Sequence, residues 1–222
     1  DLDARYLDLF VHTLSLGTMA GVLTVCAAFV LAYAHRYHAD YSTALSVRIS
    51  TLGYALPGSV LAVGVMLSLT WLDNRFADAV EWLTGEDPGL VLSGTVIALL
   101  MAYFARFLAV AYGPVDSSLE RIRPSIREAA RSLGAGQWDT VWRVYLPMLR
   151  PGLLTAGLLV LVDVMKEMPA TLLLRPFGWD TLAVRIYELT SEGEWERAAL
   201  PAVALLAVGL LPVILLVRKS AR

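Results

Sequence analysis

Long apolar runs alternate with short polar connections along almost the whole chain. Five of these runs are long enough, or nearly so, to cross the roughly 30 Å core of a bilayer as helices of about 20 residues. Backbone groups inside a bilayer must be satisfied within the structure, and the sequence lacks the alternating pattern of a membrane barrel. We therefore predict an all-α, polytopic membrane bundle with spans near 10–33, 52–71, 90–112, 153–174 and 200–217.

Composition agrees with a membrane protein. Mean hydropathy is +0.62 and 17% of the residues are charged, whereas roughly 25% are charged in a typical soluble domain. The formal net charge of −2 gives no basic field for nucleic acid, so we expect no nucleic-acid partner. The chain begins at Asp1 and has no signal peptide, so we expect it to be a fragment of a longer polypeptide.

The basic residues are distributed unevenly between the two sets of connections. Eleven Lys and Arg residues lie in 35–51, 113–152 and the tail from Arg218, whereas five lie in 1–9, 72–89 and 175–199. Because basic residues accumulate on the cytoplasmic side of membranes, we predict an outside N-terminus and a cytoplasmic C-terminus. Arg106 is expected to reach the cytoplasmic interface from the last turns of the third span.

One polar stretch between the third and fourth runs has a helical pattern of its own; we call residues 124–147 the motif loop. Ser125 is a candidate N-cap with Glu128 three residues later, and Gly134 is expected to end the short helix that follows. A second helix is expected from Gln137 until Pro147 ends it and starts the next span. Such helices could simply lie in the membrane interface, with an aromatic belt formed by Trp138, Trp142 and Tyr145.

Seven residues of the motif loop are spaced as Glu-Ala-Ala, three residues, Gly, nine residues, Ile or Val, one residue, Leu-Pro. They are Glu128, Ala129, Ala130, Gly134, Val144, Leu146 and Pro147. This spacing resembles the EAA motif of the membrane subunits of ABC importers, in which isoleucine is usual at the position of Val144. The resemblance implies that the loop docks into a groove of an ATPase subunit. No G-x-x-x-x-G-K-[ST] phosphate loop occurs, so we expect no enzymatic activity or bound cofactor in this chain, and ATP to be used by the partner.

The fourth run carries ionisable residues, which are costly inside a bilayer and therefore face protein or water. Asp163 and Lys166 are spaced to neutralise each other, Glu167 follows on a neighbouring face, and Pro169 can kink the helix. We interpret these four residues as the lining or gate of a translocation path. The alternative is a structural ion pair that locks two helices together.

Residues 166–189 closely resemble the segment that follows the EAA loop in bacterial iron(III) permeases, apart from Met168, where leucine is typical. The whole chain is similar to the C-terminal half of such a fused permease. The resemblance implies a multi-pass protein of the bacterial inner membrane that carries ferric iron from a periplasmic binding protein to the cytoplasm. It implies an ATPase homodimer and, as second permease half, the missing N-terminal half of the same polypeptide.

Other functions stay open at this stage. The cargo could be thiamine, phosphonate or a polyamine, and a proton-coupled carrier or a non-transporting scaffold would be different classes of protein. The outer connection 175–199 could dock a binding protein through its acids or be a solvated loop; these acids are Glu188, Glu192, Glu194 and Glu196. The histidines share no predicted site, so we expect no metal centre at His12, His35 or His38.

Overall fold

The computed structural model describes residues 4–37 and 40–220. Five helices in this part of the chain are long and apolar enough to cross a membrane, which confirms the all-α membrane bundle. The long helices are α1 (Ala4–Tyr37), α3 (Gly58–Thr84), α4 (Val96–Glu120), α7 (Leu146–Met165) and α10 (Trp195–Ser220). The short ones are α2 (Tyr41–Thr51), η1 (Leu52–Ala55), α5 (Pro124–Ser132), α6 (Gln137–Thr140), η2 (Val141–Tyr145), α8 (Pro169–Leu174) and α9 (Leu182–Ser191).

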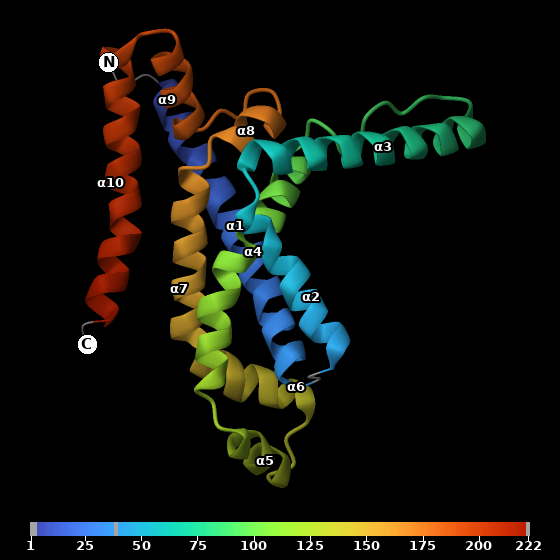
Figure 1. Ribbon diagram of the computed structural model, residues 1–222, viewed down its shortest axis with the longest axis vertical. Helices are drawn as coiled ribbons and strands as arrows, with labels where there is room; N and C mark the ends of the chain where they lie inside the picture. The colour runs from blue at the N-terminus through green and yellow to red at the C-terminus, as the bar shows by residue number, and fades with distance from the viewer. Residues whose placement is uncertain (1–3, 38–39, 221–222) are drawn as a thin grey trace.

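The core of the molecule lies where α1, α4 and α7 pack side by side (Figure 1). Small residues let α1 and α7 approach closely, because a Cβ atom on Gly17 would lie 2.6 Å from Cδ1 of Leu161. Leu16, Phe107 and Val160 contribute one buried side chain each from the three helices. These helices form the frame from which the other elements extend.

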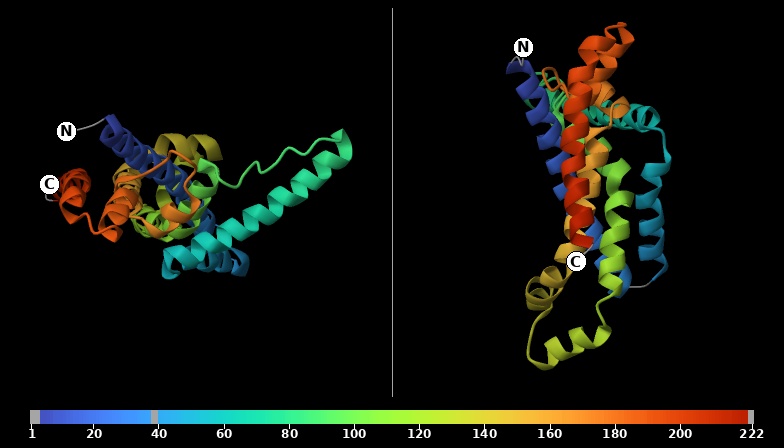
Figure 2. Two further views of the ribbon diagram at one scale, coloured as in Figure 1. Left: turned by 90° about the horizontal axis from the view of Figure 1, so that it is seen from above. Right: turned by 90° about the vertical axis from the view of Figure 1, so that its left-hand side faces the viewer.

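The second predicted span differs most from the structure. Residues 52–55 form the turn η1, and α3 begins only at Gly58 and continues to Thr84. The break follows from Pro57, which has no N–H to donate, and from Gly53, where a Cβ atom would overlap the carbonyl oxygen of Ala105 at 1.8 Å. After the break, α3 projects sideways across the direction of α1, α4 and α7 (Figures 1 and 2).

The remaining helices lie closer to their predicted positions. The predicted runs 10–33 and 200–217 fall inside α1 and α10, and α4 begins six residues after the predicted start at 90. The run 153–174 is interrupted, because α7 ends at Met165 and α8 begins at Pro169. Helix α10 stands beside α9 and contacts α7 less extensively (Figure 2).

Candidate functional site

The motif loop lies at one end of the bundle and connects α4 to α7 (Figures 1 and 2). Its first helix begins at Pro124, with Arg123 at the cap position, so the predicted N-cap at Ser125 is wrong. Proline takes the first position because its fixed φ angle suits a helix start, where no backbone donor is needed. The predicted end is confirmed: Gly134 has a φ angle of +83°, and the N–H of Ala135 donates to the carbonyl of Ala130 at 3.0 Å.

The second half of the motif loop runs into α7 without a break, so the prediction that Pro147 ends a separate helix is wrong. Its predicted place in the first turn of the next helix is confirmed, because α7 begins at Leu146. The connection is the π-turn η2, in which the N–H of Leu146 donates to the carbonyl of Val141, five residues back. This wider turn accommodates Pro147, whose ring would crowd the preceding turn of an ordinary α-helix. The motif loop is therefore joined rigidly to a membrane helix at this end.

The structure brings three of the seven motif residues into one cleft of about 330 Å³ at the corner of the motif loop. Ala130, Gly134 and Val144 line it, and an exposed ion pair, Arg143 Nε to Asp139 Oδ1 at 3.3 Å, lies beside them. The other four motif residues lie elsewhere. Ala129 and Pro147 are exposed, Leu146 is half-buried, and Glu128 lines a second cleft.

Large apolar side chains surround this corner without being covered by the chain itself. Leu133, Trp138 and Trp142 are 88%, 75% and 64% exposed. Tyr145 does not belong with them, because it is fully buried, so the three predicted belt residues do not form one surface. An exposed apolar cluster of this kind indicates a protein or membrane contact.

Sequence reasoning missed the contacts that attach the motif loop to α1. The hydroxyl groups of Tyr37 and Tyr145 are hydrogen-bonded, and the ring of Tyr33 packs edge-on against Tyr145 at a centroid distance of 5.8 Å. The guanidinium group of Arg127 lies 4.2 Å from the ring centroid of Tyr37. Only the spacing of Tyr33 and Tyr37, one helical turn apart at the end of an apolar run, could have suggested an aromatic contact.

The charged residues of the fourth run lie at the break between α7 and α8. Lys166 Nζ is 2.8 Å from Asp163 Oδ1, which is the pairing that their spacing predicts. The Lys166 side chain is 64% exposed and borders a cleft of about 370 Å³ between α7 and α10. Pro169 is the first residue of α8, so it starts a new helix instead of kinking a continuous one.

Glu167 points away from this pair and is buried against α4. Its Oε2 atom lies 3.1 Å from Nε of Arg106 in an ion pair without hydrogen-bond geometry, and its Oε1 atom accepts from the N–H of Ala170 at 3.2 Å. Arg106 also donates to the carbonyl of Leu56 before the break in front of α3. The expectation that Arg106 reaches the cytoplasmic interface is wrong, because it lies near the middle of α4.

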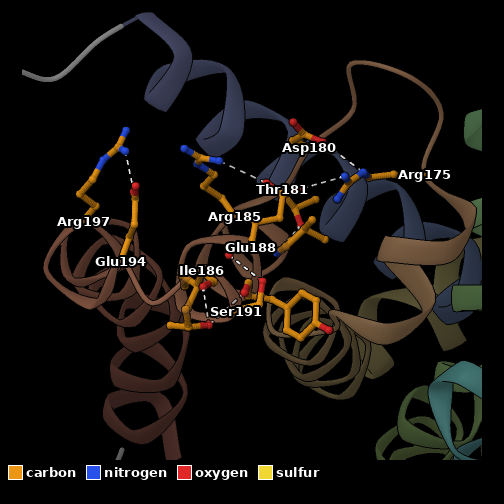
Figure 3. Close-up of polar contacts among 12 residues, drawn as sticks. Arg175, Asp180, Thr181, Arg185, Ile186, Glu188, Ser191, Glu194 and Arg197 are labelled. Atoms are coloured by element: carbon orange, nitrogen blue, oxygen red, sulfur yellow. Dashed lines mark hydrogen bonds and ion pairs between the residues drawn. The ribbon is translucent and has the colours of Figure 1, made fainter.

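A second polar network ties together the connection between α8 and α9 (Figure 3). Arg175 pairs with Asp180 at 3.1 Å and with Glu188 at 2.9 Å, and Arg185 pairs with the other oxygen of Glu188 at 3.3 Å. Glu194 pairs with Arg197. Of the acids proposed for docking, the exposed ones that form no ion pair within the described residues are Glu192 and Glu196.

The histidines do not converge. His12 stacks on Trp179 with ring centroids 4.7 Å apart, and His35 lies 3.4 Å from the hydroxyl of Tyr112. His38 lies outside the described residues. In residues 4–37 and 40–220, no three His, Cys, Asp or Glu side chains are grouped to hold a metal ion. The prediction that the chain holds no metal centre stays a prediction.

Comparison with known proteins matches residues 24–222 to the family model described as binding-protein-dependent transport system inner membrane component. The Fe(3+)-transport system permease protein FbpB 2 of Haemophilus influenzae is 29% identical over 96% of this chain and 39% of its own length. The putative 2-aminoethylphosphonate transport system permease protein PhnV of Salmonella typhimurium is 28% identical over 97% of this chain and 75% of its own length. The chain thus spans well under half the length of the first relative.

Among solved structures, a bacterial alginate ABC transporter in complex with an alginate pentasaccharide-bound periplasmic protein contains a similar chain. The TM-score is 0.70 at 15% identity, and the match covers 96% of this chain and 77% of the other. At this identity the similarity shows a shared fold.

Proposed function

Because this chain belongs to the binding-protein-dependent transport system inner membrane components, we propose that it forms one half of the membrane-spanning path of an ATP-driven importer. The motif loop carries this proposal. Its corner combines three EAA-motif residues in one cleft with the exposed apolar side chains of Leu133, Trp138 and Trp142. A surface of that kind fits a protein partner, and we assign it to the ATPase subunit. The chain itself binds no cofactor, and its partner uses the ATP.

The proposed orientation places the motif loop and the C-terminus in the cytoplasm of a bacterium and the N-terminus outside its inner membrane. It is supported by the eleven basic residues on the side of the motif loop, against five on the other side. The two ends of the bundle are also physically separate, since α5 lies at the end opposite α8 and α9 (Figure 1).

The proposed partners follow from this orientation. An ATPase homodimer binds the motif loop, and a periplasmic binding protein meets the outer end, where Glu192 and Glu196 are exposed. A second permease half completes the path. The relative with iron in its name is more than twice as long as the matched region, which supports a second half on the same polypeptide. We place that half on the N-terminal side, because the chain resembles the C-terminal half of fused iron(III) permeases.

The proposed path runs past the break between α7 and α8. Interrupted membrane helices with ionisable residues line substrate paths in other transporters, because the free helix ends and charges need polar neighbours. Lys166 is the exposed member of the set, with Asp163 paired to it. Glu167 and Pro169 shape the break itself, because the carboxylate of Glu167 caps the helix that Pro169 starts.

The proposed cargo is ferric iron. It is supported by the similarity to the Haemophilus Fe(3+) permease and by the segment 166–189. A second candidate cargo is 2-aminoethylphosphonate, because the permease PhnV matches at almost the same identity over most of its length.

The test is reconstitution of the full permease with its ATPase and binding protein in proteoliposomes. ATP hydrolysis is measured with the binding protein loaded with ferric iron, loaded with 2-aminoethylphosphonate, or empty. We expect stimulation by the ferric form. Stimulation by 2-aminoethylphosphonate alone would contradict the proposal that the cargo is ferric iron, but it would support the proposal that the protein is an ATP-driven importer. Uptake that ignores ATP and stops when the proton gradient collapses would contradict the importer itself.

A matched pair of variants tests the role of the motif loop. Glu128→Lys should abolish stimulated hydrolysis and transport while membrane insertion stays intact. Glu86→Lys makes the same charge change in an exposed connection beyond α3 and should leave both activities near the parent values. Equal activity of the two variants, with normal assembly of the complex, would refute the assignment.

A further inference from the structure

The second cleft at the motif loop is strongly basic. It has a volume of about 470 Å³ and lies between one face of α5 and the end of α1. Three arginines line it together with one acid; the full lining is Arg36, Tyr37, Pro124, Arg127, Glu128 and Arg131. The four α5 residues are spaced three and four apart, which puts them on a single helix face turned toward α1. The cleft therefore gathers three guanidinium groups against one carboxylate.

Among the described residues, two of the three arginines have no paired acid, and Arg36 is partly compensated. The guanidinium carbon of Arg127 lies over the ring of Tyr37, 4.2 Å from its centroid, and an arginine in such a contact can still bind an anion through its N–H groups. Arg36 donates one N–H to the carbonyl of Ile122 and acts electrostatically on Asp116 of α4. Within residues 4–37 and 40–220, Arg127 and Arg131 form no ion pair.

Positive charges one helical turn apart repel each other, and an anion between them removes that repulsion. Arg127 and Arg131 have this spacing, and Arg36 faces them from α1. Guanidinium groups bind phosphate oxygens through paired, charge-assisted hydrogen bonds, so phosphate is the anion that best fits three of them.

The position of the cleft indicates where such a phosphate comes from. Helix α1 has 34 residues and is about 50 Å long at 1.5 Å per residue, so it extends beyond a core of about 30 Å. Tyr33 and Tyr37 are half-buried at the end of α1 beside the cleft, and tyrosines are enriched at the depth of lipid headgroups. We propose that the cleft binds the phosphate of an anionic phospholipid and thereby anchors α5 to the membrane surface.

Native mass spectrometry of the full permease with its ATPase tests this, using dioleoylphosphatidylglycerol as probe and dioleoylphosphatidylcholine as the uncharged comparison. Arg127→Gln with Arg131→Gln should weaken phosphatidylglycerol binding roughly 25-fold, from two lost surface charges. Arg121→Gln with Arg150→Gln removes two exposed charges outside the cleft and should change it little. Arg127→Lys with Arg131→Lys keeps the charge and should retain most of the binding, which controls for misfolding.

Three results would overturn the proposal. The first is equal phosphatidylglycerol binding by the parent and the double glutamine variant. The second is binding of inorganic phosphate at the cleft with no preference for the phospholipid, which would identify a free anion. The third is lipid binding only after the ATPase is removed, which would make the cleft an ATPase contact. Glu128, which the transport test changes, also lines this cleft. The proposed transport role nevertheless depends on cargo-stimulated ATP hydrolysis, which is measured independently of lipid binding.

Discussion

The ion pair between Arg106 and Glu167 connects three separate parts of the chain at one point. It joins the middle of α4 to the break after α7, and Arg106 adds a hydrogen bond to the carbonyl of Leu56 in front of α3. Both side chains are largely buried, 18% and 7% exposed. A buried pair contributes little compared with apolar packing, but either partner alone is a buried, uncompensated charge.

Glu167→Gln should therefore destabilise the full permease by about 3–5 kcal/mol, because it leaves the charge of Arg106 unpaired. Thermal unfolding of the purified protein measures this as a lower Tm. Asp139→Asn is the matched control and should lose less than about 1 kcal/mol, because Asp139 and its partner Arg143 are 53% and 82% exposed. Adding Arg106→Met to Glu167→Gln should recover much of the loss. If the double variant were less stable than Glu167→Gln alone, Glu167 would not act mainly by compensating the charge of Arg106.

Two glycines of α3 provide a second test at this point. A Cβ atom on Gly58 would lie 2.4 Å from Oε1 of Glu167, whereas one on Gly64 would meet nothing within 4 Å. Gly58→Ala should destabilise by about 1–3 kcal/mol, because the carboxylate must move away from Arg106. Gly64→Ala should be neutral or stabilise by up to about 1 kcal/mol, since alanine favours helix. Equal Tm values would show that the carboxylate moves freely.

The individual elements show which features the sequence could predict. The glycine corner at Gly134 was predictable because only glycine adopts its positive φ angle easily. The continuity of α6, η2 and α7 was not, because Pro147 favours a helix start and a π-turn has no simple residue pattern. The pairing of Asp163 with Lys166 followed from local spacing, but that of Glu167 with Arg106 joins residues 61 positions apart (167 − 106) and depends on packing.

The backbone conformation at the corner of the motif loop can be tested by substitution. Gly134 has a φ angle of +83°, so Gly134→Ala strains the backbone by about 1–2 kcal/mol and shifts the loop away from its docked shape. Stimulated ATP hydrolysis should fall roughly five- to thirtyfold. Gly136→Ala is the matched control, because its φ angle of −70° suits any residue, and it should keep the parent rate. If Gly136→Ala lost as much activity as Gly134→Ala, the corner would require small residues and not a positive φ angle at Gly134.

For the whole molecule, hydropathy predicted the number of long apolar helices but not their directions. Residues 58–84 are apolar enough to span a membrane, yet α3 projects across α1, α4 and α7 (Figure 2). From the end of α1 the chain turns back along α2, which lies beside α1 and α4, before α3 begins (Figure 1). Asp73 then holds the following connection back against α3, by accepting N–H bonds from Leu92 and Ser93 at 2.8 and 2.7 Å. Nothing in local composition specifies such a direction, because it results from tertiary contacts.

The orientation of the protein in the membrane depends on the arrangement of all its helices. The connection after α3 and the helix α5 lie at opposite ends of the bundle (Figure 1). In a background with Cys26→Ser, we expect a membrane-impermeant maleimide to label Glu86→Cys in intact cells and Ser132→Cys only after permeabilisation. Both sites are exposed, so access to the reagent should depend on the side of the membrane. The reverse pattern would put the motif loop outside, where no ATPase could reach it, and would refute the importer together with the orientation.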